Sequence, residues 1–223
     1  MTEIYQIAID GPSGAGKSTI AKRVASELSI DYIDTGAMYR AVGLKMLRNN
    51  IPMAEDETLF EMLKDTDVDF SEGKVYLDGE DVSGLIRTQE VSKAASDCSA
   101  FASVRRKLVE LQQAMGKRKS VIMDGRDIGT VVLKDAEHKY YLTATAEERA
   151  MRRYKELKEK GSGDTYEKVL QDVNQRDWND MHREVDPLRQ AEDAVLIDST
   201  HMTIDQVVDF IISDIKKDKL GKS

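Results

Sequence analysis

Cysteine is almost absent from this sequence, and long apolar runs are missing altogether. Cys98 is the single cysteine, so no internal disulfide can form, in keeping with a reducing compartment. No apolar run approaches the length that spans a bilayer. The N-terminal residues also lack the basic segment, apolar core and small-residue cleavage site of a secretory signal. We therefore expect a cytoplasmic protein with no membrane-bound part.

The chain as a whole has fewer basic than acidic residues. The 33 lysines and arginines are outnumbered by 41 aspartates and glutamates, which gives a formal net charge of -8. This balance argues against general binding to nucleic acid or to anionic membranes. Any polyanionic ligand must instead be met by a local basic site. We expect small-molecule partners, no nucleic-acid partner and a monomeric chain.

The organisation of the chain predicts an α/β fold. Its 223 residues can build one sizeable core plus an insert, and no repeat or low-complexity tract interrupts them. Five short apolar runs are the expected core strands: residues 4–9, 32–34, 121–124, 139–142 and 195–198. Helical periodicity is expected over residues 17–28, 37–47, 104–115, 147–158, 166–179 and 204–215. Helices thus cover the connections that a parallel sheet requires.

Residues 68–87 break this alternation. Their apolar and polar residues alternate, and Gly73-Lys74 and Asp78-Gly79 are typical of tight turns. We predict a small antiparallel insert there that has no independent core. The residues that follow return to helical spacing, with a break expected near Phe101.

The strongest motif is DGPSGAGKSTIAKR at residues 10–23. It matches G-x-x-x-x-G-K-[ST] from Gly11 to Ser18, directly after an expected strand and before an expected helix. Backbone N–H groups of such a loop cradle phosphates, Lys17 reaches the β- and γ-phosphates, and Ser18 binds Mg²⁺. The alternative is a glycine-rich turn with an exposed lysine. We predict a nucleoside triphosphate site with Mg²⁺ at Ser18.

A phosphate-binding loop alone leaves GTPases, motor ATPases, transporters and small-molecule kinases open. Basic residues on separate elements favour phosphoryl transfer between two phosphates, because charge must be held on both sides of the transferring group. Each of them has a simpler alternative, a solvated helix face. The candidates are Arg40, Arg105, Arg126, Arg149, Arg152, Arg153, Arg176 and Arg183.

Five motifs in order resemble the bacterial cytidylate kinase family: DGPSGAGKST, DTGAMYR, IRTQEVSKAAS, MDGRDIGTVV and a PL pair after lid-type basic residues. The match runs essentially end to end. The resemblance implies transfer of a phosphoryl group from ATP to CMP or dCMP. It also implies a P-loop NTPase fold in one domain, residues 1–223, whose five-stranded parallel sheet has the order 2-3-1-4-5. A monophosphate-binding insert is expected at about residues 37–115 and a lid at about 152–185.

The resemblance also assigns roles to individual residues. ATP binding is implied for Gly11, Pro12, Ser13, Gly14, Ala15, Gly16, Lys17, Ser18 and Thr19, and catalytic roles for Lys17, Arg126, Arg152, Arg153 and Arg176. CMP binding is implied for Thr35, Arg40, Ser96, Arg105, Arg126, Asp127, Asp180 and Arg183. Thr35 stands where the family often has serine, and both residues carry the hydroxyl. A place near Mg²⁺ is implied for Asp124, the acid that ends a later strand.

Other functions stay open at this point. The acceptor could be another small molecule, such as shikimate or UMP, although Arg105 and Asp127 favour cytosine. A nucleotide-sensing module that hydrolyses little is opposed by the number of arginines. A GTPase is less favoured still, because no N/T-K-x-D guanine motif is present.

Overall fold

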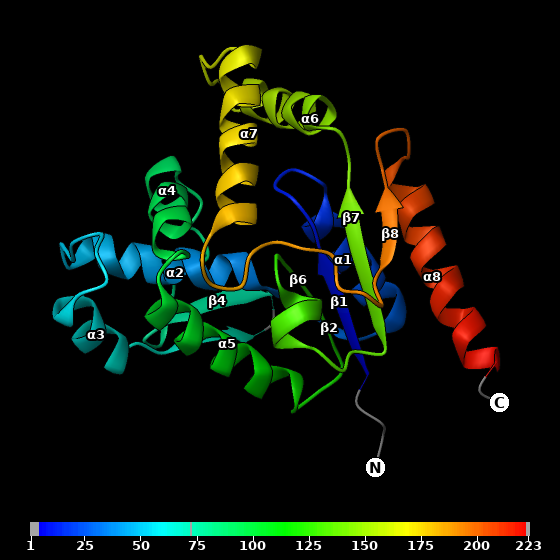
Figure 1. Cartoon of the computed structure of the whole chain (residues 1–223), viewed down its shortest axis with the longest axis horizontal. Coiled ribbons are helices and arrows are strands. Elements are labelled where there is room, and N and C mark those ends of the chain that lie inside the picture. The colour runs from blue at the N-terminus through cyan, green and yellow to red at the C-terminus, as the bar shows by residue number, and fades with distance from the viewer. Residues whose placement is uncertain (1–4, 72, 222–223) are drawn as a thin grey trace.

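The computed structural model describes residues 5–71 and 73–221, and its centre is a parallel sheet (Figure 1). The strands are β1 (Gln6–Asp10), β2 (Asp31–Asp34), β6 (Val121–Gly125), β7 (His138–Thr143) and β8 (Val195–Asp198). Their order is β2-β6-β1-β7-β8. Numbered as core strands alone, this is the predicted order 2-3-1-4-5, so the predicted α/β fold is confirmed.

The register of the sheet brings several chemically important strand ends together. Asp10, the last residue of β1, pairs with Gly125 of β6 on one side and with Tyr141 of β7 on the other. Asp34 of β2 pairs in turn with Asp124 of β6. Ligands of open α/β sheets bind beyond the carboxyl ends of the strands. The sheet therefore places its binding edge at these residues.

Helices cover both faces of the sheet, because alternate residues of the buried strands point to opposite sides. On one face, Ile7 and Ile9 pack with α1 (Lys17–Leu28) and α8 (Ile204–Gly221). On the other face, Ala8 packs with α2 (Thr35–Arg48) and α5 (Ala102–Gly116). The central strands β1 and β6 thus supply side chains to two separate apolar cores.

The predicted antiparallel insert is present as β3 (Val68–Ser71), β4 (Lys74–Leu77) and β5 (Glu80–Asp81). Asp78 and Gly79 join the last two strands with φ of 51° and 84°, the pair of positive values that a tight hairpin turn needs. The chain then forms α4 (Gln89–Cys98), breaks at Phe101 as predicted, and continues into α5.

One helix of the insert region, α3 (Glu57–Lys64), is absent from the predicted elements. The Asp56 carboxylate caps it by accepting a hydrogen bond from the Leu59 N–H at 3.0 Å. Insert residues such as Phe70 and Leu77 share one apolar cluster with Ile33 of the sheet.

Two helices stand beyond the carboxyl ends of the strands (Figure 1). They are α6 (Ala146–Glu159) and α7 (Tyr166–His182), joined through Gly161, whose φ is 78°. They pack on each other through Ala150, Val169 and Val173, an apolar cluster separate from the two sheet cores. Within residues 5–71 and 73–221, no helix combines the length and apolar character needed to cross a membrane.

Candidate active site

The phosphate-binding loop lies between β1 and α1, as the motif predicts. Gly11 has φ of 150°, and a Cβ there would lie 1.9 Å from the carbonyl oxygen of Leu142, so no other residue fits without moving β7. Gly16 precedes α1 with φ of 89°, and no side chain caps the helix. The first N–H groups of α1 are therefore available to an anion.

Lys17 is buried at the start of α1. Its ammonium donates to the carbonyl oxygens of Gly11 and Pro12, both at 2.8 Å. Burial and the positive charge of Arg126 lower the pKa of Lys17 to about 7, while the carboxylate of Asp124 opposes the shift. A bound polyphosphate would raise this pKa again and favour the charged lysine.

Asp124 is the acidic centre of the site. Its carboxylate accepts hydrogen bonds from the hydroxyls of Ser18 and Tyr32, each at 2.8 Å. Its backbone carbonyl accepts another from the Thr35 hydroxyl at 2.7 Å. Burial raises the pKa of Asp124, and Lys17 opposes that shift. Among the described residues, no group of three or more His, Cys, Asp or Glu side chains could hold a metal ion.

Four arginines from separate elements influence one another near this centre. Arg126 donates through Nε to Asp180 at 2.6 Å. Burial lowers the pKa of Arg176, and the positive charges of Arg126, Arg40 and Arg153 lower it further. In a chain of net charge -8, this local concentration of cations indicates an anionic ligand.

A second set of buried charged side chains is centred on Arg105 of α5. Arg105 is 1% exposed and forms a salt bridge with Asp127. Its Nε also donates to Asp186 at 3.2 Å and its Nη1 to the Ser99 carbonyl at 3.2 Å. Arg183 approaches Asp127 at 3.8 Å. Burial raises the pKa of Asp127, whereas the two arginines oppose the shift. The structure thus brings Arg105, Asp127 and Arg183 together.

Three predicted residues have other partners. Ser96 is half-buried on α4, where its carbonyl accepts the Ser99 hydroxyl at 2.8 Å. Arg152 donates to the Ser199 carbonyl at 2.9 Å. Arg153 is exposed on α6 and pairs with Glu156 at 3.1 Å. Their assigned roles stay predictions.

Arg149 is one of the candidate arginines of the sequence, but no specific role was predicted for it. It donates to the Ser13 carbonyl of the phosphate-binding loop at 2.8 Å and to the Asp177 carboxylate of α7 at 2.6 Å. It therefore ties the loop to both helices beyond the sheet. The only sequence signal is its place in ERAMRR. Helical periodicity does not indicate which of the three arginines in that segment contacts the phosphate-binding loop.

Asp10 and Asp186 are also absent from the predicted site. The Asp10 carboxylate accepts the N–H groups of Ile128 and Gly129 at 2.8 and 2.7 Å. Asp186 has φ of 47° and holds Arg105. Asp10 could have been noticed because it directly precedes the loop motif.

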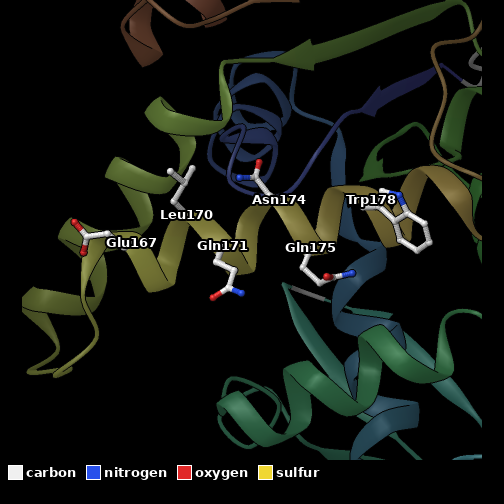
Figure 2. A pocket seen from close by; sticks show the side chains of 6 residues that line it. All are labelled: Glu167, Leu170, Gln171, Asn174, Gln175 and Trp178. Carbon is white, nitrogen blue, oxygen red and sulfur yellow. The ribbon is translucent and has the colours of Figure 1, made fainter.

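An open hollow of about 500 Å³ runs along α7. Its lining residues are Glu167, Leu170, Gln171, Asn174, Gln175 and Trp178, which Figure 2 shows projecting from successive turns of the helix. Trp178 is 59% exposed and stacks on His182 with 4.7 Å between ring centroids. The hollow does not include residues of the phosphate-binding loop.

A phosphate-binding loop, a cluster of arginines and a second group of buried charged side chains at one sheet edge define the class of P-loop kinases. At the level of the fold, the chain is similar to a shikimate kinase from Bacteroides thetaiotaomicron, with a TM-score of 0.51 and 13% identity over 96% of this chain and 99% of that one. This likeness concerns the fold alone.

The sequence comparisons define the family within that class. The family model described as Cytidylate kinase matches residues 7–217. The chain is 56% identical over 210 residues to the cytidylate kinase of Caldicellulosiruptor saccharolyticus, covering 92% of this chain and 93% of that protein. It is 51% identical over 217 residues to the cytidylate kinase of Clostridium perfringens, covering 97% and 100%. The chain belongs to the cytidylate kinase family, which confirms the resemblance, and it is a phosphotransferase of the kinase class.

Proposed function

We propose that this protein transfers the γ-phosphoryl group of ATP to CMP or dCMP, giving ADP and CDP or dCDP. The observation that carries the proposal is the two-sided site. The loop carries Lys17, a separate buried pair is formed by Arg105 and Asp127, and Arg126, the residue before Asp127, is close enough to Lys17 to lower its pKa. Relatives named cytidylate kinase support the choice of acceptor.

The chemistry needs positioning more than proton transfer. An oxygen of the acceptor phosphate attacks the γ-phosphorus, and the bond from that phosphorus to the bridging oxygen of ADP breaks. The attacking oxygen is already ionised near neutral pH, so no strong base is required. Lys17 and Arg126 would stabilise the negative charge of the transferring group. Arg40, which pairs with Asp34 at 2.9 Å, would hold the acceptor phosphate.

Mg²⁺ fits the residues present at Ser18 and Asp124. Both supply oxygen donors, their side chains lie 2.8 Å apart, and Mg²⁺ in such sites keeps waters and phosphate oxygens as its other ligands. When bound, the ion neutralises charge on the phosphates. Tyr32 would keep the Asp124 carboxylate oriented through its own hydrogen bond.

We further propose that residues of about 152–185 act as a lid and those of about 37–115 as the acceptor-binding insert. The separate apolar cluster between α6 and α7 supports movement of these helices as one unit. Closure would bring Arg153 and Arg176 onto the ATP phosphates and exclude water, which prevents wasteful hydrolysis.

The proposed activity uses free nucleotides, so we propose that the protein works in the cytoplasm. No step described above needs a second subunit, and we propose that the active species is a monomer. Size-exclusion chromatography at assay concentration tests this, since elution as a dimer with full activity would contradict it.

The acceptor is tested directly by ADP release from Mg-ATP across CMP, dCMP, UMP, AMP, GMP and shikimate. We expect CMP and dCMP to give the highest kcat/KM. Leaving a buried donor or acceptor unpaired costs roughly 1 to 3 kcal/mol, so UMP should be slower by about one to two decades. Faster turnover of shikimate or UMP would reject the proposed acceptor.

Trp178 provides a test of lid movement. It is the single tryptophan and lies exposed on α7 beside the hollow of Figure 2. We expect its fluorescence to change when a non-hydrolysable ATP analogue and CMP bind together, and to change less with either alone. Shikimate in place of CMP is the control and should add nothing to the analogue. An unchanged spectrum with both nucleotides would show that α7 keeps its surroundings.

A further inference from the structure

The buried carboxylate of Asp10 has no role in the function described so far. Asp10 is 4% exposed, ends β1, and directly precedes Gly11 of the phosphate-binding loop. Burying a carboxylate costs free energy unless hydrogen bonds and charges compensate for it. Here burial raises the pKa of Asp10 to about 7, the Gly129 and Ile128 N–H groups oppose the shift, and the charge of Asp127 adds to it. Because burying this carboxylate costs free energy, its place there indicates a contact that a smaller or apolar side chain would not make.

The contacts of Asp10 are two hydrogen bonds to backbone N–H groups. Its Oδ1 accepts the Ile128 N–H at 2.8 Å, and its Oδ2 accepts the Gly129 N–H at 2.7 Å. These two residues begin a π-helical turn, Ile128–Val132, a rare form that is frequently found at functional sites. The first N–H groups of a helix have no partner within it. Asp10 satisfies two of them with one carboxylate.

The π-helical turn held by Asp10 directly follows Arg126 and Asp127, the two residues proposed above to bind the acceptor. Arg126 and Asp127 lie between the end of β6 and the first residue of the π-helical turn. The Asp127 carbonyl accepts the Val131 N–H at 2.8 Å, so the residue belongs to the turn itself. The segment is thus fixed at one end by β6 and at the other by Asp10.

We propose that Asp10 is a positioning residue that sets Arg126 and Asp127 at the correct place relative to the phosphate-binding loop. One carboxylate then joins the ATP side of the site, through the adjacent Gly11, to the acceptor side. This inference rests on the proposed function, because it concerns recognition of the acceptor nucleotide. It assigns Asp10 no contact with either substrate.

The substitution Asp10→Asn tests the proposal with little change in volume. An amide offers one acceptor oxygen, and its NH₂ group would face a backbone N–H. One of the two hydrogen bonds is lost, and the NH₂ group lies against the N–H group of Ile128 or Gly129. The two donors repel each other, and the π-helical turn shifts. We expect KM for CMP to rise about tenfold and the CMP-over-UMP ratio of kcat/KM to fall by a similar factor. KM for ATP should stay within about twofold, because the loop that binds it keeps its own geometry.

Glu137→Gln is the matched control. Its carboxylate also accepts a backbone N–H, from Gln6 at 2.7 Å, but at the opposite end of β1 from Asp10 and outside the proposed insert and lid. The chemical change is the same, and any general loss of stability appears in thermal unfolding of both variants. We expect Glu137→Gln to leave both KM values unchanged.

Amide hydrogen exchange gives a readout that does not depend on activity. In Asp10→Asn, the amides of Ile128 and Gly129 should exchange faster, while those of β6 keep their protection. If wild type fails to phosphorylate CMP, the proposed function fails, and the exchange of these two amides still decides whether Asp10 holds the turn.

The kinetic outcomes separate positioning from a general structural role. An unchanged KM for CMP, or equal losses for CMP and ATP, would overturn the proposal. Should Asp10→Asn not fold, Asp10→Ser removes the carboxylate without placing an NH₂ group against the backbone N–H groups, and it allows the same comparison. Failure of both variants to fold would also overturn it, since the carboxylate would then be required by the fold itself.

Discussion

Replacing Lys17 with alanine is expected to lower kcat by about 100- to 1,000-fold while the protein stays folded. The lysine would lie where the transferring phosphoryl group carries its greatest negative charge. Its ammonium already sits between the Gly11 and Pro12 carbonyls at 2.8 Å, so a short rotation brings it to a phosphate. The loss concerns the transition state, and kcat should therefore fall more than affinity for CMP changes.

The fold should survive the substitution for an electrostatic reason. Burial lowers the pKa of Lys17 to about 7, which means that the charged side chain is held there at a cost in free energy of folding. Alanine removes that cost. Lys64→Ala, on an exposed lysine of α3 paired with Glu61, is the control and should retain full activity. Lys17→Ala with a normal circular dichroism spectrum and near-normal kcat would contradict the assignment of the site.

Local sequence patterns predict most of the fold because its elements follow strict periodicities. The helix expected at residues 17–28 is observed as Lys17–Leu28. Helix α3 is missed because its eight residues carry too short an apolar pattern, although Asp56 is a good capping residue. The π-helical turn at Ile128–Val132 has no local signal. Its first N–H groups are satisfied by Asp10, which lies 118 and 119 residues away in sequence.

The residues of the candidate site also fall into two groups: those that a local sequence motif predicts, and those whose position depends on tertiary packing. The phosphate-binding loop is predictable since a single contiguous motif carries its geometry, down to the positive φ of Gly16. The roles of the three arginines in ERAMRR depend instead on how α6 docks against the sheet. That docking directs Arg149 to the loop and Arg152 to Ser199. Such a choice is made by tertiary packing, which spacing along one helix does not reveal.

Discrimination between CMP and UMP is expected to collapse when Asp127 is replaced. Cytosine offers an amine donor at C4 and an unprotonated N3, whereas uracil offers a carbonyl at C4 and an N3–H. A carboxylate accepts from the first base and repels the second. Arg105, a fixed donor in contact with Asp127, likewise favours the unprotonated N3. Both residues are buried, so an unpaired partner would not be compensated by water.

Asp127→Ala should therefore reduce kcat/KM for CMP by about one to two decades, the equivalent of roughly 1 to 3 kcal/mol, and reduce that for UMP far less. Asp127→Asn keeps the volume and gains an NH₂ donor for the C4 carbonyl of uracil, so it should favour UMP further. The quantity to measure is the CMP-over-UMP ratio of kcat/KM at saturating Mg-ATP, with Asp205→Ala on the surface of α8 as the control. A constant ratio while both rates fall together would show that Asp127 does not read the base. Its role would then be confined to holding Arg105 and Arg183, the two arginines on either side of it.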